Sequence, residues 1–188
     1  MAALNQGLQV LQEQLLQAPL SGKGVEVSIV TFGAGVEIVQ DFITADRFRP
    51  FVLRARGETT PLGAAILFGL DHLESRKAWW QLNEVPCSRP WVVLITDGVP
   101  QGEPLETTRL ANQRIRDVES AGQAVFLAVG IAGANVPLLA RISVRPPVKL
   151  RKLCFAELFT WLSASLAGAG TADDPQIDLG AAPGWPDG

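Results

Sequence analysis

The sequence contains only one histidine, His72, and only two cysteines, Cys87 and Cys154. Two thiols cannot build a disulfide framework or a four-cysteine zinc site, and one histidine cannot build a histidine-rich metal site. The P-loop, the dinucleotide-binding glycine loop and the hydrolase nucleophile elbow are missing from the sequence as well. These absences exclude the commonest nucleotide, zinc and hydrolase chemistries. We interpret the cysteines as reduced thiols of a cytoplasmic protein.

Charge and long apolar runs are also scarce. Charged residues make up 19% of the chain, the net charge is -3 and the isoelectric point is about 5.2. This balance gives no general attraction to nucleic acid or to an anionic membrane. No apolar run approaches the roughly 20 residues that a membrane span needs, and the N-terminus has no signal-peptide pattern. We therefore expect neither a nucleic-acid nor a membrane partner.

What is present is a regular alternation of helix and strand patterns. Helical spacing of apolar residues predicts helices over 2–17, 60–77, 104–121, 136–141 and 154–166. Short apolar runs predict strands over 25–32, 36–39, 91–96, 124–129 and 148–150. Pro19 and the Ser21-Gly22 turn are expected to end the first helix. The third helix is expected to bury Leu105, Leu110, Ile115 and Val118.

Two further patterns concern the second helix and the strands. Thr60-Pro61 predicts a helix start, with Thr60 as N-cap and Pro61 at the first helical position, and Trp79 and Trp80 after the helix. Gly33-Ala34-Gly35 predicts a tight turn between two antiparallel strands. The continuous apolar run over 91–96 is typical of a parallel strand buried on both faces.

These elements predict an α/β fold with a doubly wound, mostly parallel sheet and one antiparallel edge hairpin. We expect one domain over residues 1–166 and a flexible acidic tail over residues 167–188, with Trp185 as an unconstrained tail residue. Ligands of such sheets bind at the carboxyl ends of the strands. The candidate chemistry is therefore expected in the loops after Phe32, before Thr60 and after Thr96.

Two of these loops contain suitable oxygen ligands. Thr60 offers a hydroxyl at a helix start, and Asp97 offers a carboxylate at the end of a buried strand. Such ligands suit a hard cation, Mg²⁺ first and Mn²⁺ or Ca²⁺ as alternatives. Each residue taken singly has a simpler interpretation, Thr60 as an N-cap and Asp97 as a turn residue. Their joint occurrence in this order of strands and helices favours a metal site.

The same motifs carry a family resemblance. Thr96-Asp97-Gly98 after a buried strand, preceded by Thr60-Pro61-Leu62-Gly63 and Thr31-Phe32-Gly33, resembles a von Willebrand factor A (VWA) domain. The amino-acid sequences of residues 3–8 and 27–32 are similar to those of the tellurium-resistance, TerY-like branch of this family. The resemblance covers residues 2–166 and implies a Rossmann-like fold.

The resemblance implies a metal-ion-dependent adhesion site made by an Asp-x-Ser-x-Ser loop, a threonine and an aspartate. The threonine corresponds to Thr60 and the aspartate to Asp97. The implied activity is non-enzymatic: a divalent ion at this site binds an acidic side chain of a protein partner. The implied setting is tellurium resistance or stress response.

The sequence departs from this family in one respect. It contains no Asp-x-Ser-x-Ser element and lacks the first, central strand that should precede it. Three of the five usual ligand side chains are therefore missing, and we expect metal binding by this chain to be weak or absent. Three accounts stay open: a start placed too far downstream, a truncated remnant, or a strand supplied by another chain.

Two alternative functions also stay open at this point. One is a metal-free scaffold remnant, and the other is a hydrolytic or phosphoryl-handling α/β enzyme that uses Asp97. The enzyme would need a general base or a basic phosphate-binding cluster, and the sequence contains no such pattern, so no catalytic residue is assigned.

Other residues that could suggest a site have structural interpretations. We interpret His72 as an ordinary helix residue. Glu103 and Glu106 are interpreted as acidic residues at the start of their own helix, where the helix dipole favours them. Trp79, Trp80 and Trp91 are assigned to core and rim packing, and the oligomeric state is left undetermined.

Overall fold

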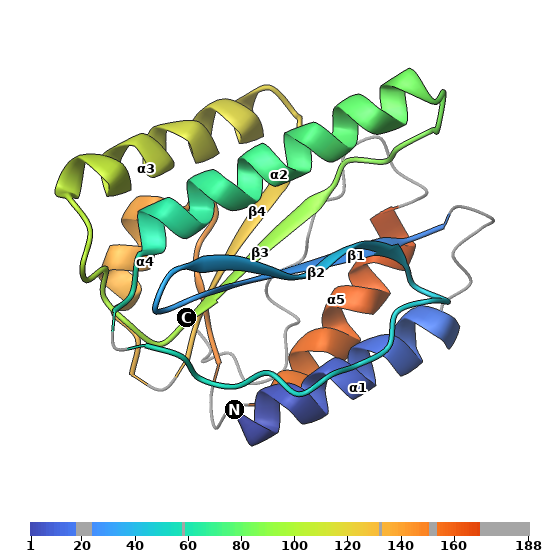
Figure 1. Ribbon diagram of the computed structural model, residues 1–188, viewed down its shortest axis with the longest axis horizontal. Coiled ribbons are helices and arrows are strands. Elements are labelled where there is room, and N and C mark those ends of the chain that lie inside the picture. Colours follow the sequence, from blue (N-terminus) through green and yellow to red (C-terminus); the bar gives the residue numbers. More distant parts are fainter. Residues whose placement is uncertain (18–23, 58, 132, 151–153, 170–188) are drawn as a thin grey trace. The chain divides into compact units, whose positions relative to one another are not determined.

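The computed structural model describes residues 1–17, 24–57, 59–131, 133–150 and 154–169. In chain order its elements are α1 (Ala2–Gln17), β1 (Glu26–Phe32), β2 (Val36–Thr44), α2 (Leu62–Leu82), β3 (Trp91–Thr96), α3 (Leu105–Ser120), β4 (Val125–Gly130), α4 (Val136–Ile142), β5 (Val148–Lys149) and α5 (Phe155–Ala169). The described residues thus form a mixed α/β protein with five helices, a parallel three-stranded sheet and an antiparallel two-stranded sheet (Figure 1). None of the helices in these ranges is both long and apolar enough to cross a membrane.

The chain divides into two compact units. The first comprises Met1–Ile29, Gln40–Ala55 and Leu150–Gly188, and the second comprises Val30–Val39 and Arg56–Lys149. Strands β1 and β2 each run from one unit into the other. The parallel sheet and helices α2, α3 and α4 lie wholly in the second unit.

In the first unit, α1 packs against α5 through a close approach at Gly7. A Cβ atom on Gly7 would lie 2.6 Å from the Phe155 Cβ atom and 2.9 Å from the Phe159 ring, so only glycine allows this packing. Leu8 and Leu15 are buried on the α1 side of the contact. The structure confirms the predicted helix over 2–17, while its predicted stop at Pro19 and Ser21-Gly22 lies outside the described residues.

The segment after β2 runs without helix or strand beside α1, and polar side chains of α1 hold it. The Asn5 amide donates to the Leu53 carbonyl at 3.0 Å and accepts from the Leu53 N–H at 2.9 Å. Gln12 donates to the carbonyl oxygen of Phe48, whose side chain is completely buried. Helix α1 thus satisfies backbone groups that no strand satisfies here. Residues 54–57 at the end of this segment form neither helix nor strand.

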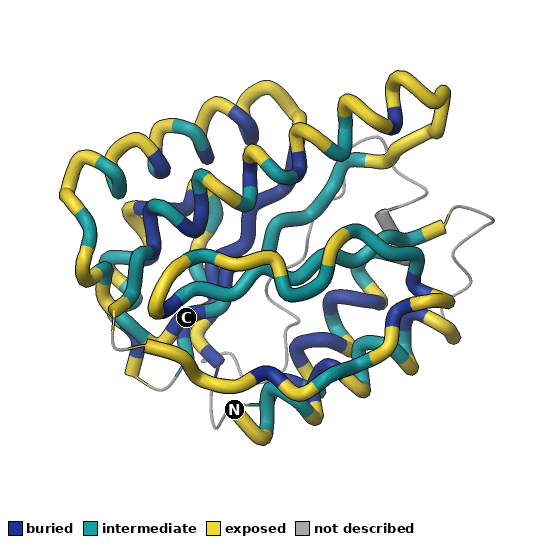
Figure 2. Tube along the Cα trace, viewed as in Figure 1, coloured by how far each residue is buried: buried dark blue, intermediate teal, exposed yellow. Residues whose placement is uncertain are grey.

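In the second unit, β3, β4 and β5 form the parallel sheet in that order. Helix α2 contacts β3, α3 contacts β4, and the two helices lie side by side along the sheet (Figure 1). Every residue of β4 is buried, whereas β3 buries only Leu94 and Thr96 (Figure 2). The prediction that the 91–96 strand is buried on both faces is therefore wrong. The reason is its position at the end of the sheet, where a strand neighbour covers only one edge.

The antiparallel hairpin differs from prediction in two ways. Its second strand, β2, continues to Thr44 rather than ending at Val39. Together with β1 it forms a sheet of its own, rather than the edge of the larger sheet. No strand of the described residues pairs with both β1 and β3.

Three helices also differ from prediction. Helix α2 continues to Leu82 and includes both Trp79 and Trp80, and α5 continues to Ala169 rather than ending at residue 166. In α3, Leu105 and Leu110 are 85% and 55% exposed instead of buried. Ile115 and Val118 are buried as predicted, and Ala111 joins them on the buried face of α3. The predicted tail beyond residue 169, including Trp185, lies outside the described residues.

Candidate functional site

Three loops of the second unit meet in the structure: those after β1, before α2 and after β3. The Thr59 hydroxyl donates to the carbonyl oxygen of Gly33, which joins the first two loops. Thr60 and Gln101 form an antiparallel bridge, with N···O distances of 3.1 and 2.9 Å, which joins the second loop to the third. Gly102, at φ +79°, lies against Thr59 in the same region. The three loops predicted from the sequence therefore form one cluster.

The turn after β3 positions the candidate carboxylate. Thr96 is buried, and its hydroxyl oxygen accepts a hydrogen bond from the Gly98 N–H at 3.2 Å, which closes a short turn around Asp97. The Thr96 carbonyl accepts from Ile131 N at 2.9 Å and ties the strand end to the residue after β4. Asp97 itself is exposed. The fold thus presents this carboxylate to solvent at the end of β3.

The two residues proposed as metal ligands lie on adjacent loops. The Thr60 hydroxyl oxygen lies 3.2 Å from the position that a Cβ atom on Gly98 would occupy, so it contacts the residue next to Asp97. Neither the Thr60 hydroxyl nor the Asp97 carboxylate makes a hydrogen bond to another group of the described residues. Both side chains therefore keep oxygen atoms available for a ligand.

The prediction that Thr60 is the N-cap of α2 is wrong. The capping position is occupied by Pro61, and no side chain of the capping residue bonds to the helix. The Glu103 carboxylate instead accepts hydrogen bonds from the N–H groups of Gly63 and Ala64, at 2.7 and 3.0 Å. The Thr108 hydroxyl donates to the same carboxylate at 3.0 Å. Glu103 thus caps α2, not its own helix α3.

The oxygen ligands at this site match a hard cation in type but not in number. One carboxylate and one hydroxyl are of the type that Mg²⁺ accepts, but Mg²⁺ requires six oxygen ligands. In the ranges that the structure describes, no group of three or more His, Cys, Asp or Glu side chains could hold a metal ion. A cation here would therefore need most of its ligands from water or from another molecule.

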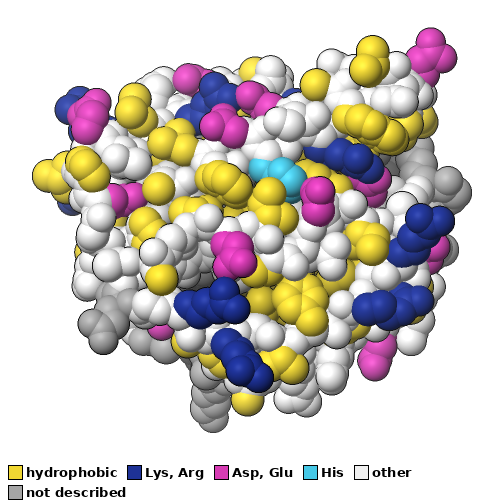
Figure 3. Space-filling view, in the orientation of Figure 1, with side chains coloured by type: hydrophobic (Ala, Val, Ile, Leu, Met, Phe, Trp, Pro, Cys, Tyr) yellow, Lys and Arg dark blue, Asp and Glu magenta, His cyan; other side chains and the backbone are white. Residues whose placement is uncertain are grey.

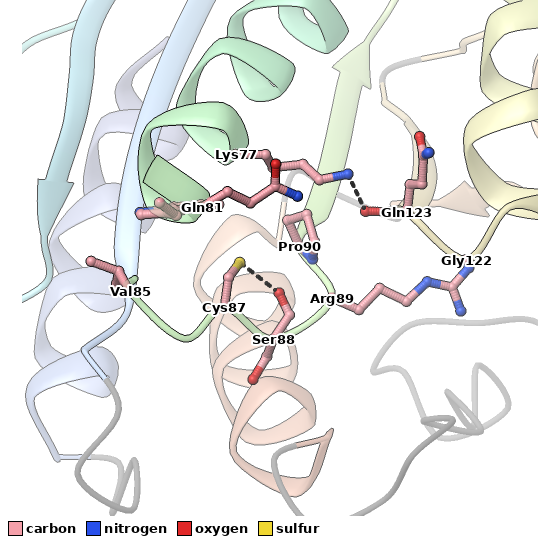
Figure 4. A pocket seen from close by; sticks show the side chains of 10 residues that line it. Lys77, Gln81, Val85, Cys87, Ser88, Arg89, Pro90, Gly122 and Gln123 are labelled. Atoms are coloured by element: carbon pink, nitrogen blue, oxygen red, sulfur yellow. Dashed lines mark hydrogen bonds between the residues drawn. The ribbon is translucent and has the colours of Figure 1, made fainter. Parts of the chain in front are cut away.

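A hollow of the second unit lies elsewhere. It has a volume of about 340 Å³ and lies between the end of α2 and the segments that lead into β3 and β4. Figure 4 shows Lys77 donating to the Gln123 carbonyl, at 3.4 Å, and Cys87 donating to the Ser88 carbonyl, at 3.0 Å. This hollow is at the amino ends of the strands, opposite to Thr60 and Asp97.

The remaining sequence candidates also lie apart from the site. His72 is half-buried within α2 and lies on the face seen in Figure 3. Trp80 is buried, and Trp79 is 46% exposed with the Arg76 guanidinium 4.2 Å from its ring centre. These positions agree with packing roles for the tryptophans.

Compared with known proteins, the chain matches no family model and no curated protein.

Proposed function

We propose that the chain is a non-enzymatic protein-interaction module of the VWA type, with a Rossmann-like, doubly wound arrangement of its elements. Thr60 and Asp97 form one side of a divalent-cation site, and an acidic side chain of a protein partner provides further ligands. The observation that carries the proposal is the contact of the Thr60 hydroxyl with Gly98, beside the exposed Asp97. It places a hydroxyl and a carboxylate at the carboxyl end of a parallel strand, where such folds bind ligands.

The capping of α2 supports an interaction module over a phosphoryl-handling enzyme. A free helix N-terminus binds phosphate through its exposed N–H groups. At α2 two of these groups are already bound by the Glu103 carboxylate. A phosphate group at this position would meet a negative charge instead of free donors.

The setting of the proposed function rests on the sequence resemblance alone. It places the chain in tellurium resistance or a related stress response of the cytoplasm. Both cysteines are free thiols, as expected in a reducing compartment.

Binding of Mn²⁺ tests the cation site. We expect weak binding, with a dissociation constant on the order of 1 mM, because most ligands must come from water. Mn²⁺ should broaden the amide NMR signals of residues near Thr60 and Asp97 first, and a glutamate-containing peptide should tighten the binding. Asp97→Asn and Thr60→Val should each remove the local broadening.

A matched control is Glu106→Gln, which removes an exposed carboxylate of the same unit. This variant should retain the local broadening. If Asp97→Asn and Glu106→Gln behave alike, the cation proposal is wrong.

A further inference from the structure

Every lysine or arginine that the structure describes in the first unit lies in the segment after β2. These residues are Arg47, Arg49 and Arg54, and each of them is exposed. Residues 46–54, which we call the basic segment, contain these three arginines and one acidic residue, Asp46. The basic segment therefore has a net charge of +2, in a chain whose net charge is -3.

The backbone of the basic segment is held in place. The segment runs beside α1 (Figure 1), and side chains of that helix bind its backbone, Asn5 at Leu53 and Gln12 at Phe48. The side chains of Phe48 and Leu53 are buried, whereas the neighbouring arginines are exposed. The fold thus presents three positive side chains to solvent from a backbone that is fixed at two points.

Within the described ranges, no ion pair neutralises these arginines. Arg49 donates to two backbone carbonyl oxygens, at 2.7 and 2.9 Å, and not to a carboxylate. Arg47 and Arg54 form no ion pair with any described residue. A hydrogen bond from the Thr44 side chain and, to a lesser extent, the charge of Arg47 lower the pKa of Asp46. The basic segment therefore keeps positive charge that an acidic group can neutralise.

The same chain contains a segment of the opposite charge. Residues 170–188, which we call the aspartate segment, contain no lysine or arginine and four aspartates: Asp173, Asp174, Asp178 and Asp187. The aspartate segment lies outside the described residues and follows α5, which packs against α1 in the first unit. Asp178 is nine residues beyond Ala169. Nine residues can reach about 30 Å, which is about the diameter of a small domain.

We propose that the aspartate segment binds the basic segment of its own chain, with its carboxylates against the three arginines. Charge complementarity carries the proposal, and the spacing of the charges is compatible with it. Asp173 and Asp178 are five residues apart, and so are Arg49 and Arg54. Two extended segments that lie side by side can therefore form both pairs at once. This contact belongs to the first unit and does not depend on the proposed cation site.

An apolar contact can add to the charge pairs. Val52, within the basic segment, is 70% exposed. In the aspartate segment, Ile177 and Leu179 stand on either side of Asp178. Covering Val52 with either side chain would remove apolar surface from water. The basic segment thus fits an occupant that is both acidic and apolar, as the aspartate segment is.

The covalent connection makes a contact of this size sufficient. A single exposed ion pair contributes little and is screened by salt. A separate peptide with the sequence of residues 170–188 should therefore bind with a dissociation constant on the order of 1 mM. A segment that is joined to α5 has an effective concentration of the same order, about 1 mM. A substantial fraction of the chains should then hold the contact at low ionic strength.

A spin label on the aspartate segment tests the contact in the full chain. Ala181→Cys is labelled with a nitroxide in a chain in which Cys87 and Cys154 are replaced by serine. At low ionic strength the label should broaden the amide NMR signals of residues 46–54. At about 1 M salt, where the screening length is only about 3 Å, most of this broadening should be lost.

Charge variants test which groups make the contact. Replacement of the three arginines of the basic segment by glutamine should remove most of the broadening, and so should replacement of the four aspartates by asparagine. The matched control lowers the net charge equally at three exposed arginines of the second unit and should keep the broadening: Arg109→Gln, Arg116→Gln and Arg141→Gln.

Four outcomes overturn the proposal. The first is a labelled chain in which residues 46–54 are not broadened, and the second is broadening that survives the loss of the four aspartates. The third is an equal loss of broadening in the two triple arginine variants. The fourth is equal broadening when the label and the ¹⁵N nuclei are on different copies, which would mean that the segment binds another chain. The experiment is done in EDTA, so failure of the cation site leaves its result unaffected.

Discussion

The Glu103 carboxylate accepts a hydrogen bond from the Gly63 N–H at 2.7 Å, across 40 residues of sequence. Gly63 lies in the first turn of α2, whose first N–H groups have no partner within the helix. A carboxylate at this end also interacts favourably with the helix dipole. The bond therefore fixes the start of α2 to the loop that follows β3, which keeps Thr60 and Asp97 on adjacent loops.

Removal of the Glu103 carboxylate should destabilise the chain. Glu103→Ala leaves the N–H groups of Gly63 and Ala64 and the Thr108 hydroxyl without this acceptor. We expect the free energy of unfolding to fall by about 2 kcal/mol, the upper range for loss of a helix cap. Glu103→Gln keeps one acceptor and should lose about half as much, about 1 kcal/mol. Urea unfolding followed by circular dichroism measures both values.

The control for this prediction is Glu106→Ala. Glu106 is exposed and, within the described part of the chain, pairs with Arg109 on the same helix at 3.3 Å, so its loss should cost less than about 0.5 kcal/mol. Equal effects of the two alanine variants would show that Glu103 does not stabilise the start of α2.

A methyl group at position 98 should disturb the candidate site directly. The Cβ atom of Gly98→Ala would lie 3.2 Å from the Thr60 hydroxyl oxygen and 3.5 Å from its methyl carbon, so Thr60 must move by a few tenths of an ångström. We expect Mn²⁺ binding to weaken severalfold, with a loss of stability of about 1 kcal/mol. Gly35→Ala, whose added Cβ atom contacts nothing within 4 Å, should change neither quantity. Normal Mn²⁺ binding by Gly98→Ala would argue against Thr60 as a ligand.

Local sequence patterns predicted most of the elements but not their long-range partners. The ranges of α1 and β3 were predicted to the residue, because their apolar spacing and flanking residues are both local. The capping of α2 by Glu103 could not be predicted, since the two segments are 40 residues apart and Thr60-Pro61 offered a local alternative. The exposure of Leu105 and Leu110 depends on which face of α3 meets the sheet, and composition does not determine that face.

The candidate site was partly predictable for a topological reason. Carboxyl ends of parallel strands meet at one edge of a sheet, so the loop of Asp97 could be placed near that of Thr60 before the structure was known. The contact with Gly98 and the turn closed by Thr96 depend on atomic packing. Sequence patterns do not resolve such contacts.

Two glycine-to-alanine substitutions should have opposite effects on stability. Gly7→Ala places a Cβ atom 2.6 Å from that of Phe155 in the α1–α5 contact. Overpacking of this kind costs about 1–3 kcal/mol, which exceeds the gain of about 1 kcal/mol in helix propensity. Gly69→Ala in α2 meets nothing within 4 Å and should gain about 0.5–1 kcal/mol. Thermal unfolding midpoints should fall for Gly7→Ala and rise for Gly69→Ala. A higher midpoint for Gly7→Ala would mean that α1 and α5 do not approach closely at Gly7.

A buried ion pair in the second unit allows a further prediction. The Glu119 side chain is only 5% exposed, and its Oε1 atom accepts from Arg145 Nε at 3.1 Å and from Phe126 N at 2.9 Å. The second carboxylate oxygen, Oε2, is buried without a hydrogen-bond partner. Arg145→Ala would leave this charge buried without its cation, and we expect a loss of about 3 kcal/mol in urea unfolding.

Two further variants test whether the loss of stability in Arg145→Ala comes from the buried Glu119 charge or would follow the removal of any arginine. Arg109→Ala removes an exposed partner of Glu106, at 3.3 Å, and should cost less than about 0.5 kcal/mol. In the Arg145→Ala background, Glu119→Gln removes the stranded charge while its amide oxygen still accepts from Phe126 N. The double variant should therefore recover part of the lost stability. A double variant less stable than Arg145→Ala alone would mean that the cost comes from lost packing of the arginine and not from the buried charge.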